Sequence, residues 1–95
     1  MYDLSKVTPE HFECLIGTLL PISNSDHALE VRSVERLRSP SPRPEPFSVT
    51  LLTPTGLQGP QGMYTLVHPD LGELALFLVP IETKDGRSRM ELVFN

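Results

Sequence analysis

The last third of the chain carries an apolar and polar pattern that predicts three consecutive β-strands. In the middle one, residues 73–81 are apolar on both sides of an extended chain, with Leu74, Leu76 and Leu78 on one side and Ala75, Phe77 and Val79 on the other. Strands at residues 63–68 and 87–95 flank it, and the second of these alternates, with Met90, Leu92 and Phe94 facing in. A strand that is apolar on both faces belongs in the interior of a sheet or beneath another element. We therefore expect residues 73–81 to pair with both flanking strands.

Two turn signals separate these strands. Pro69 fixes a bend between the first two strands, and Gly72 follows it. Asp85 and Gly86 form the dipeptide that favours a tight hairpin turn, here within residues 84–87. Such short connections join antiparallel neighbours, so the three strands should form a meander.

A short helix is predicted near the N-terminus, over residues 9–16. Thr8 suits the N-cap and Pro9 suits the first helical position. Gly17 ends the pattern, and the apolar positions share one face at helical spacing: Phe12, Leu15 and Ile16. About two turns of helix are marginal in isolation, so this element has to pack against the rest of the fold.

Further strands are predicted at residues 18–22, from residue 29 onward, and from Phe47 to Leu51. The alternation of the second changes phase before Val34, which fits either a β-bulge near Ser33 or a short helix, and we prefer the bulged strand. The fold class is therefore mostly β, with a minor helical part. We expect a small six-stranded antiparallel sheet, as a partly open barrel or a sandwich, with one short N-terminal helix.

Two loops interrupt a chain that we expect to form a single domain over residues 1–95. Residues 39–46 place a proline at every second position, which predicts an exposed loop of extended, polyproline character. Residues 54–62 are rich in glycine and proline and predict a second loop. A chain of this length supports one small core.

Charge and composition narrow the classes of function. Eight basic and twelve acidic residues give a net charge of −4, which argues against binding to nucleic acid. Cys14 is the single cysteine, so no internal disulfide can form, as in a reducing compartment. The sequence has no secretory signal pattern, and its longest apolar run, residues 74–81, is too short for a membrane helix. These features predict a soluble cytoplasmic protein that does not enter membranes.

Candidate metal and motif residues have simple structural interpretations. His68, Pro69 and Asp70 spell the tripeptide of the chaperone-activating J-domain, but here they separate two strands and fit a turn. His11 and Cys14 have the spacing to share a metal on the helix, yet no further ligands accompany them. We expect a solvated His11 and a packed Cys14, and we assign no metal or cofactor.

The sequence also offers no catalytic constellation. Cys14, His68 and Asp70 could be written as a triad, but nothing in their spacing brings them together. We therefore assign no catalytic residues and identify no small-molecule substrate.

The chain resembles a family of short uncharacterised bacterial proteins, a domain of unknown function. The resemblance rests on Val67-His68-Pro69, the run Leu71-Gly72-Glu73-Leu74-Ala75-Leu76-Phe77-Leu78-Val79-Pro80-Ile81, an early segment with Phe12 that ends in Gly17, the segment Pro46-Phe47-Ser48 and the terminal pair Phe94-Asn95. Met90 departs from the aromatic residue that members often carry there. Members are often encoded near phage-tail-collar-like proteins, so the resemblance implies a role in a particle or its assembly.

Two hypotheses for function follow. The first is a noncatalytic protein-interaction module, which self-associates or binds a protein partner such as a tail-fibre-like protein, in the cytoplasm or within a phage-tail-like particle. Its expected surface is the odd-numbered face of residues 73–81: Ala75, Phe77 and Val79. The alternative is a small ligand-binding barrel or an uncharacterised enzyme, although six short strands leave little interior space.

Overall fold

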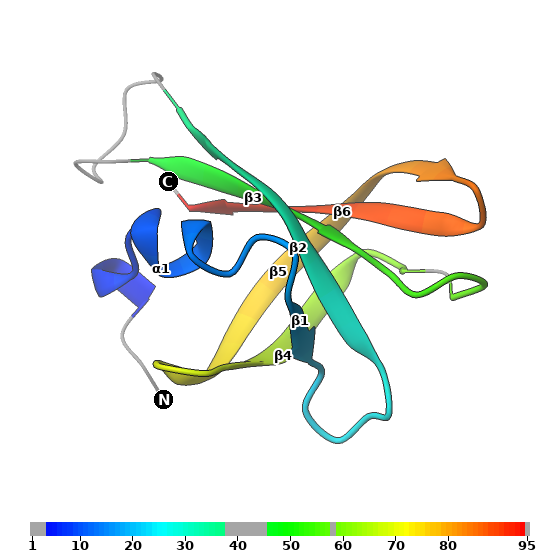
Figure 1. Cartoon of the computed structure of the whole chain (residues 1–95), viewed down its shortest axis with the longest axis horizontal. Helices are drawn as coiled ribbons and strands as arrows, with labels where there is room; N and C mark the ends of the chain where they lie inside the picture. The colour runs from blue at the N-terminus through cyan, green and yellow to red at the C-terminus, as the bar shows by residue number, and fades with distance from the viewer. Residues whose placement is uncertain (1–3, 38–45, 58, 95) are drawn as a thin grey trace.

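Six antiparallel strands form one sheet that curls into a nearly closed barrel in the order β1-β2-β3-β6-β5-β4 (Figure 1). The computed structural model describes residues 4–37, 46–57 and 59–94. Its elements are the 3-10 turn η1 (Leu4–Lys6), α1 (Glu10–Glu13), β1 (Leu19–Pro21), β2 (Ala28–Arg36), β3 (Phe47–Leu52), β4 (Gly62–His68), β5 (Gly72–Lys84) and β6 (Arg87–Phe94). The predicted fold class is confirmed. Of the two predicted forms, a partly open barrel and a sandwich, the structure has the barrel.

The strand β5 is an interior strand, as its doubly apolar pattern predicts. Its first half pairs with β4, from His68↔Gly72 to Gly62↔Leu78, and its second half pairs with β6, from Val79↔Glu91 to Lys84↔Arg87. The strand is longer than the predicted residues 73–81 because the hairpin pairing continues to the turn. A bulge between Pro80 and Glu82 accommodates the proline, which cannot donate to a regular ladder.

Two local predictions from the sequence are confirmed by the backbone. Asp85 and Gly86 both have positive φ angles, of 54° and 76°, as a tight type I′ hairpin turn requires. The ladder between β2 and β3 shifts register between Val31 and Ser33, which is the predicted bulge. The bulge explains why the apolar phase of β2 changes in mid-strand.

The barrel has one unsealed seam, between the edge strands β1 and β4. An isolated bridge joins Ile22 to Leu66 across it. Beside this bridge the Ser23 N–H donates to the Thr65 carbonyl at 2.8 Å, and the Ser23 hydroxyl donates to Glu73 at 2.7 Å. Because β1 has only three residues, it cannot pair along the full length of β4.

The helix α1 is shorter than predicted, and it plugs one end of the barrel (Figure 1). Pro9, and not the predicted Thr8, takes the cap position, with helical dihedral angles and no side-chain cap bond. The Thr8 N–H donates to His11 Nδ1 at 2.9 Å. After Glu13 the chain makes further turns to Gly17, whose φ is 91° and whose N–H donates to the Val31 carbonyl at 2.8 Å. This bond to β2 draws the chain away from the helical path, so the predicted range of 9–16 is wrong.

The core fills the barrel with the inward side chains of all six strands and of the helix. Phe12 is fully buried, with its ring centroid 6.5 Å from that of Phe47 and 5.9 Å from that of Phe94. The buried apolar residues are Val7, Phe12, Leu20, Leu29, Val31, Phe47, Val49, Leu51, Leu66, Leu74, Leu76, Leu78, Met90, Leu92 and Phe94. Burial of this set is the main stabilising contribution.

An exposed ion-pair network attaches α1 to β2. The Arg36 guanidinium lies 3.1 Å from the carboxylate of Glu10 and 3.3 Å from that of Glu13. The pKa of Glu10 lies below its ordinary value, mainly because its carboxylate accepts a hydrogen bond from its own backbone N–H. Hydrogen bonds from the side chains of Arg36 and Thr8 lower this pKa further. The network orients a helix too short to hold its own position.

The two predicted loops are partly revised. Residues 39–45 lie outside the described part of the chain, whereas Pro46 is buried, and its carbonyl accepts the Leu37 N–H at 2.8 Å, so exposure is wrong for that residue. In the second loop Gly62 belongs to β4. Gly59 lies so close to Met90 that an added Cβ would stand 2.6 Å from its sulfur.

Candidate interaction surface

The predicted surface residues Ala75, Phe77 and Val79 all lie on the outward face of β5. Their neighbours Leu76 and Leu78 are buried, as the alternation of a strand requires. Phe77 is 47% exposed, while Ala75 and Val79 are partly buried. The large aromatic side chain therefore stands at the centre of an apolar strip that faces solvent.

Met63 extends this strip onto the neighbouring strand. The register pairs Met63 of β4 with Phe77 of β5, and Met63 is 64% exposed. Directly opposed residues on one face of an antiparallel pair have Cβ atoms about 4.5–5.5 Å apart, so the two side chains are neighbours. We define the outer apolar patch as Met63, Ala75, Phe77 and Val79.

Other exposed apolar side chains flank the outer apolar patch. Ile81, at the bulge of β5, is 50% exposed. Val93 is 41% exposed. It faces outward on β6, because Glu91 opposes the outward residue Val79 and side chains two positions apart in a strand share a face. Ile16 and Leu19, elsewhere on the molecule, are the other large apolar residues exposed in the described part of the chain.

The helix does not cover the outer apolar patch. Its buried residue, Phe12, points into the end of the barrel against Phe47 and Phe94, and α1 itself lies against β2. Figure 1 shows α1 at the end of the barrel, near the end of β6. The outward apolar side chains are therefore left without a covering element among the described residues.

The family model described as "Domain of unknown function (DUF6916)" matches residues 7–94. The chain belongs to the DUF6916 family. No curated protein and no solved structure matches the chain. The matched range spans α1 and all six strands, so the DUF6916 domain comprises the complete barrel together with its helical plug.

Within the DUF6916 domain, His68 holds the hairpin turn and the helix together. Its Nδ1 accepts the backbone N–H groups of Asp70 and Leu71 at 3.0 and 3.2 Å, and its Nε2 lies 2.8 Å from the His11 carbonyl. Because Nδ1 is the acceptor, the ring is the Nε2–H tautomer, which donates to that carbonyl. The interpretation of this segment as a turn is confirmed, although the side chain of His68 makes the key bonds.

The structure brings Cys14 and His68 to one backbone atom, the His11 carbonyl, which accepts the Nε2–H of His68 at 2.8 Å and the thiol of Cys14 at 3.8 Å. Cys14 is exposed, so its predicted packing is wrong. His11 is partly buried, with its ring 6.2 Å from that of His68, so the expected solvated side chain is also wrong. Within the described ranges, no group of three or more His, Cys, Asp and Glu residues could hold a metal ion.

An apolar hollow of about 260 Å³ opens at the mouth of the DUF6916 barrel, beside the seam. The Tyr64 hydroxyl, which donates to the Pro60 carbonyl, holds the loop at one wall. The lining residues are Ile22, Ser25, His27, Leu29, Thr53, Leu57, Gly59, Pro60, Tyr64 and Met90. Because these residues come from several strands and loops, the sequence pattern of no single strand reveals the hollow. No helix in the described residues is long and apolar enough to cross a membrane.

Proposed function

We propose that the protein is a noncatalytic protein-interaction module that docks through the outer apolar patch. The observation that carries this proposal is the pairing of Met63 with Phe77 on the outward face of β4 and β5, where the two residues are 64% and 47% exposed. Contiguous exposed apolar patches are uncommon on small soluble monomers and mark interaction sites. Aromatic and Met side chains are enriched at the centres of protein interfaces.

We further propose that the partner is either a second copy of the chain or a component of a phage-tail-like particle, for which the protein acts as an accessory or assembly factor. The resemblance to bacterial proteins encoded near phage-tail-collar-like proteins supports this choice. On this proposal the protein works in the cytoplasm during assembly or remains in the particle, and it binds neither nucleic acid nor membrane.

A matched pair of variants tests the proposal. Phe77→Ser removes the centre of the outer apolar patch, whereas Ile16→Ser removes an equally exposed apolar side chain, 49% against 47%, on the turn after α1. Sedimentation velocity of the purified protein measures self-association, and affinity capture of a tail-fibre-like partner detects binding to a different protein. We expect Phe77→Ser to abolish association and Ile16→Ser to retain it, with both variants melting like the parent.

A monomeric parent that captures no partner at micromolar concentration would contradict the proposal. So would association that Phe77→Ser and Ile16→Ser weaken equally, because the effect would then follow general surface hydrophobicity.

The apolar hollow favours a second candidate function, a small ligand-binding barrel. Its volume of about 260 Å³ is near the lower limit for ligand pockets, which is roughly 300 Å³. Its walls would suit a compact apolar molecule held near Tyr64 and Met90. Thermal-shift measurements with a panel of small apolar compounds test this candidate; a stabilisation that Leu29→Ala abolishes would favour it over the interaction module.

A further inference from the structure

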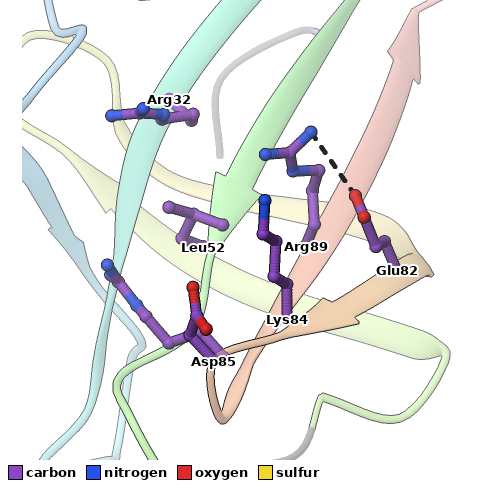
Figure 2. A pocket seen from close by; sticks show the side chains of 7 residues that line it. Arg32, Leu52, Glu82, Lys84, Asp85 and Arg89 are labelled. Carbon is purple, nitrogen blue, oxygen red and sulfur yellow. Dashed lines mark ion pairs between the residues drawn. The ribbon is translucent and has the colours of Figure 1, made fainter.

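A second concave surface lies on the outward side of β2, β3, β5 and β6, beyond the bulge of β5 (Figure 2). It has a volume of about 260 Å³. We call it the basic hollow, and its lining residues are Arg32, Leu52, Glu82, Lys84, Asp85, Arg87 and Arg89. Its composition is unusual in a protein of net charge −4: six of the eight basic residues lie in the described part of the chain, and four of these six line the hollow.

Strand register assembles this surface from distant parts of the sequence. Leu52 of β3 opposes Arg89 of β6, and Arg89 in turn opposes Glu82 of β5. Figure 2 shows Arg32 and Arg89 on separate strands around Leu52, with the amine of Lys84 directed into the space between them. All of these side chains are therefore on one face of the curled sheet.

The cations of the basic hollow differ in how far they are already neutralised. Arg87 is engaged, because it donates to the Thr53 carbonyl at 2.8 Å and to Glu30 at 3.2 Å. Arg89 lies 3.5 Å from Glu82.

Two cations in the hollow are only weakly paired with carboxylates of the protein. The Arg32 side chain is 60% exposed and approaches Glu30 only at 4.0 Å. Lys84 makes no ion pair with any side chain in the described ranges. Arg32, with only this long ion pair, and Lys84 are therefore the least neutralised cations of the hollow.

We propose that the basic hollow binds an acidic segment of the protein partner, with Asp or Glu carboxylates paired to Arg32 and Lys84. This inference rests on the proposed function, because it assigns the chemistry of the partner beside the outer apolar patch. Val79 and Glu82 are three residues apart on β5, or roughly 10 Å, so one partner can contact both surfaces. A planar guanidinium binds a carboxylate through two parallel hydrogen bonds, and the lysine ammonium adds a point charge.

The acidic side chains of the hollow favour a peptide over a nucleic acid. Glu82 and Asp85 stand among the cations, and a continuous phosphate backbone would have to pass close to both carboxylates. An acidic peptide places carboxylates at separate points and presents its own N–H groups to Glu82 and Asp85. Charge complementarity at two cationic points thus selects isolated carboxylates.

Fluorescence anisotropy with a fluorescein-labelled hexaglutamate peptide tests the proposal at low salt, with a fluorescein-labelled oligothymidylate as the competing probe. We expect hexaglutamate to bind, and the double variant Arg32→Gln/Lys84→Gln to weaken its affinity by about fivefold to tenfold, as two exposed ion pairs allow. The single variant Lys84→Gln is matched by Lys6→Gln, which removes the same charge elsewhere. Lys6→Gln should change the affinity by less than about twofold, since Lys6 lies outside the hollow.

Three results would overturn the proposal: no hexaglutamate binding at low salt, equal losses in Lys84→Gln and Lys6→Gln, or oligothymidylate binding at least as tight as hexaglutamate. The variant Phe77→Ser separates this proposal from the proposed function. It should retain hexaglutamate affinity, because Phe77 does not line the basic hollow. The association measurements test the outer apolar patch independently. A failure of hexaglutamate binding would therefore overturn the acidic-segment proposal without affecting the evidence that the outer apolar patch is an interface.

Discussion

Truncation of Phe12 should remove much of the stability of the barrel. Phe12 is fully buried and contacts three rings, those of Phe47, Phe94 and His68, the last edge-on at 5.5 Å. Phe12→Ala should cost about 3–5 kcal/mol, because it removes buried surface and leaves a cavity that the strand ends cannot fill. We expect a value of about 4 kcal/mol, since aromatic pairs contribute beyond their buried area.

This loss is large for a domain of 95 residues, whose total stability is expected to be roughly 5–14 kcal/mol. Urea denaturation followed by far-ultraviolet circular dichroism would measure it, and the melting temperature should fall by about 16–32 °C. Ile16→Ala, in the turn after the same helix but 49% exposed, is the control and should cost less than about 1 kcal/mol. A loss below about 1.5 kcal/mol for Phe12→Ala would refute the plugged-barrel account.

Three further predictions address the register, the hairpin turn and the helix anchor. Leu76→Asp should unfold the protein because it places a charge in the core, whereas Phe77→Asp, one residue along, should melt within a few degrees of the parent; equal melting of the two would contradict the register of β5. Gly86→Ala should cost about 1–2 kcal/mol in urea denaturation, because φ at that residue is 76°; an unchanged midpoint would argue against the type I′ turn. Glu10 has a lowered pKa, so its stabilising contribution is present above the ordinary glutamate value of 4.5 and is lost as the pH falls through the folded-state pKa. The melting temperatures of the parent and of Glu10→Gln should therefore differ at pH 7 and converge in acid; a difference that grows on acidification would exclude the ion pair with Arg36 as its cause.

Local signals in the sequence predict the strands, the bulge and the turns because each depends on residues close together in the chain. The bulge near Ser33 follows from a phase change within a few residues, and the turn at Asp85 and Gly86 follows from one dipeptide. The apolar spacing overestimates the length of the helix, because it continues to Ile16. The bond from Gly17 to the Val31 carbonyl, which ends the helical path, is a tertiary contact that no local pattern encodes.

The two candidate surfaces were accessible to sequence reasoning to different degrees. The doubly apolar pattern of residues 73–81 identified Phe77, because alternation alone places it opposite the buried leucines. Met63 was missed, since its position beside Phe77 depends on the pairing of β4 with β5. The basic hollow was missed for the same reason: Arg32 and Lys84 are distant in sequence and meet only through β3 and β6.

Site-specific photo-crosslinking at position 77 tests the central claim, a protein-binding outer apolar patch, most directly. Benzoylphenylalanine would replace Phe77, a conservative change for an exposed aromatic side chain, in the cells that make the protein. The same probe at Ile16, which is exposed to a similar extent, is the control. We expect position 77 to give one discrete crosslinked species, a second copy of the chain or a single partner protein, that position 16 does not give. Crosslinks that are absent at position 77, or that match those at position 16 in yield and identity, would contradict the account.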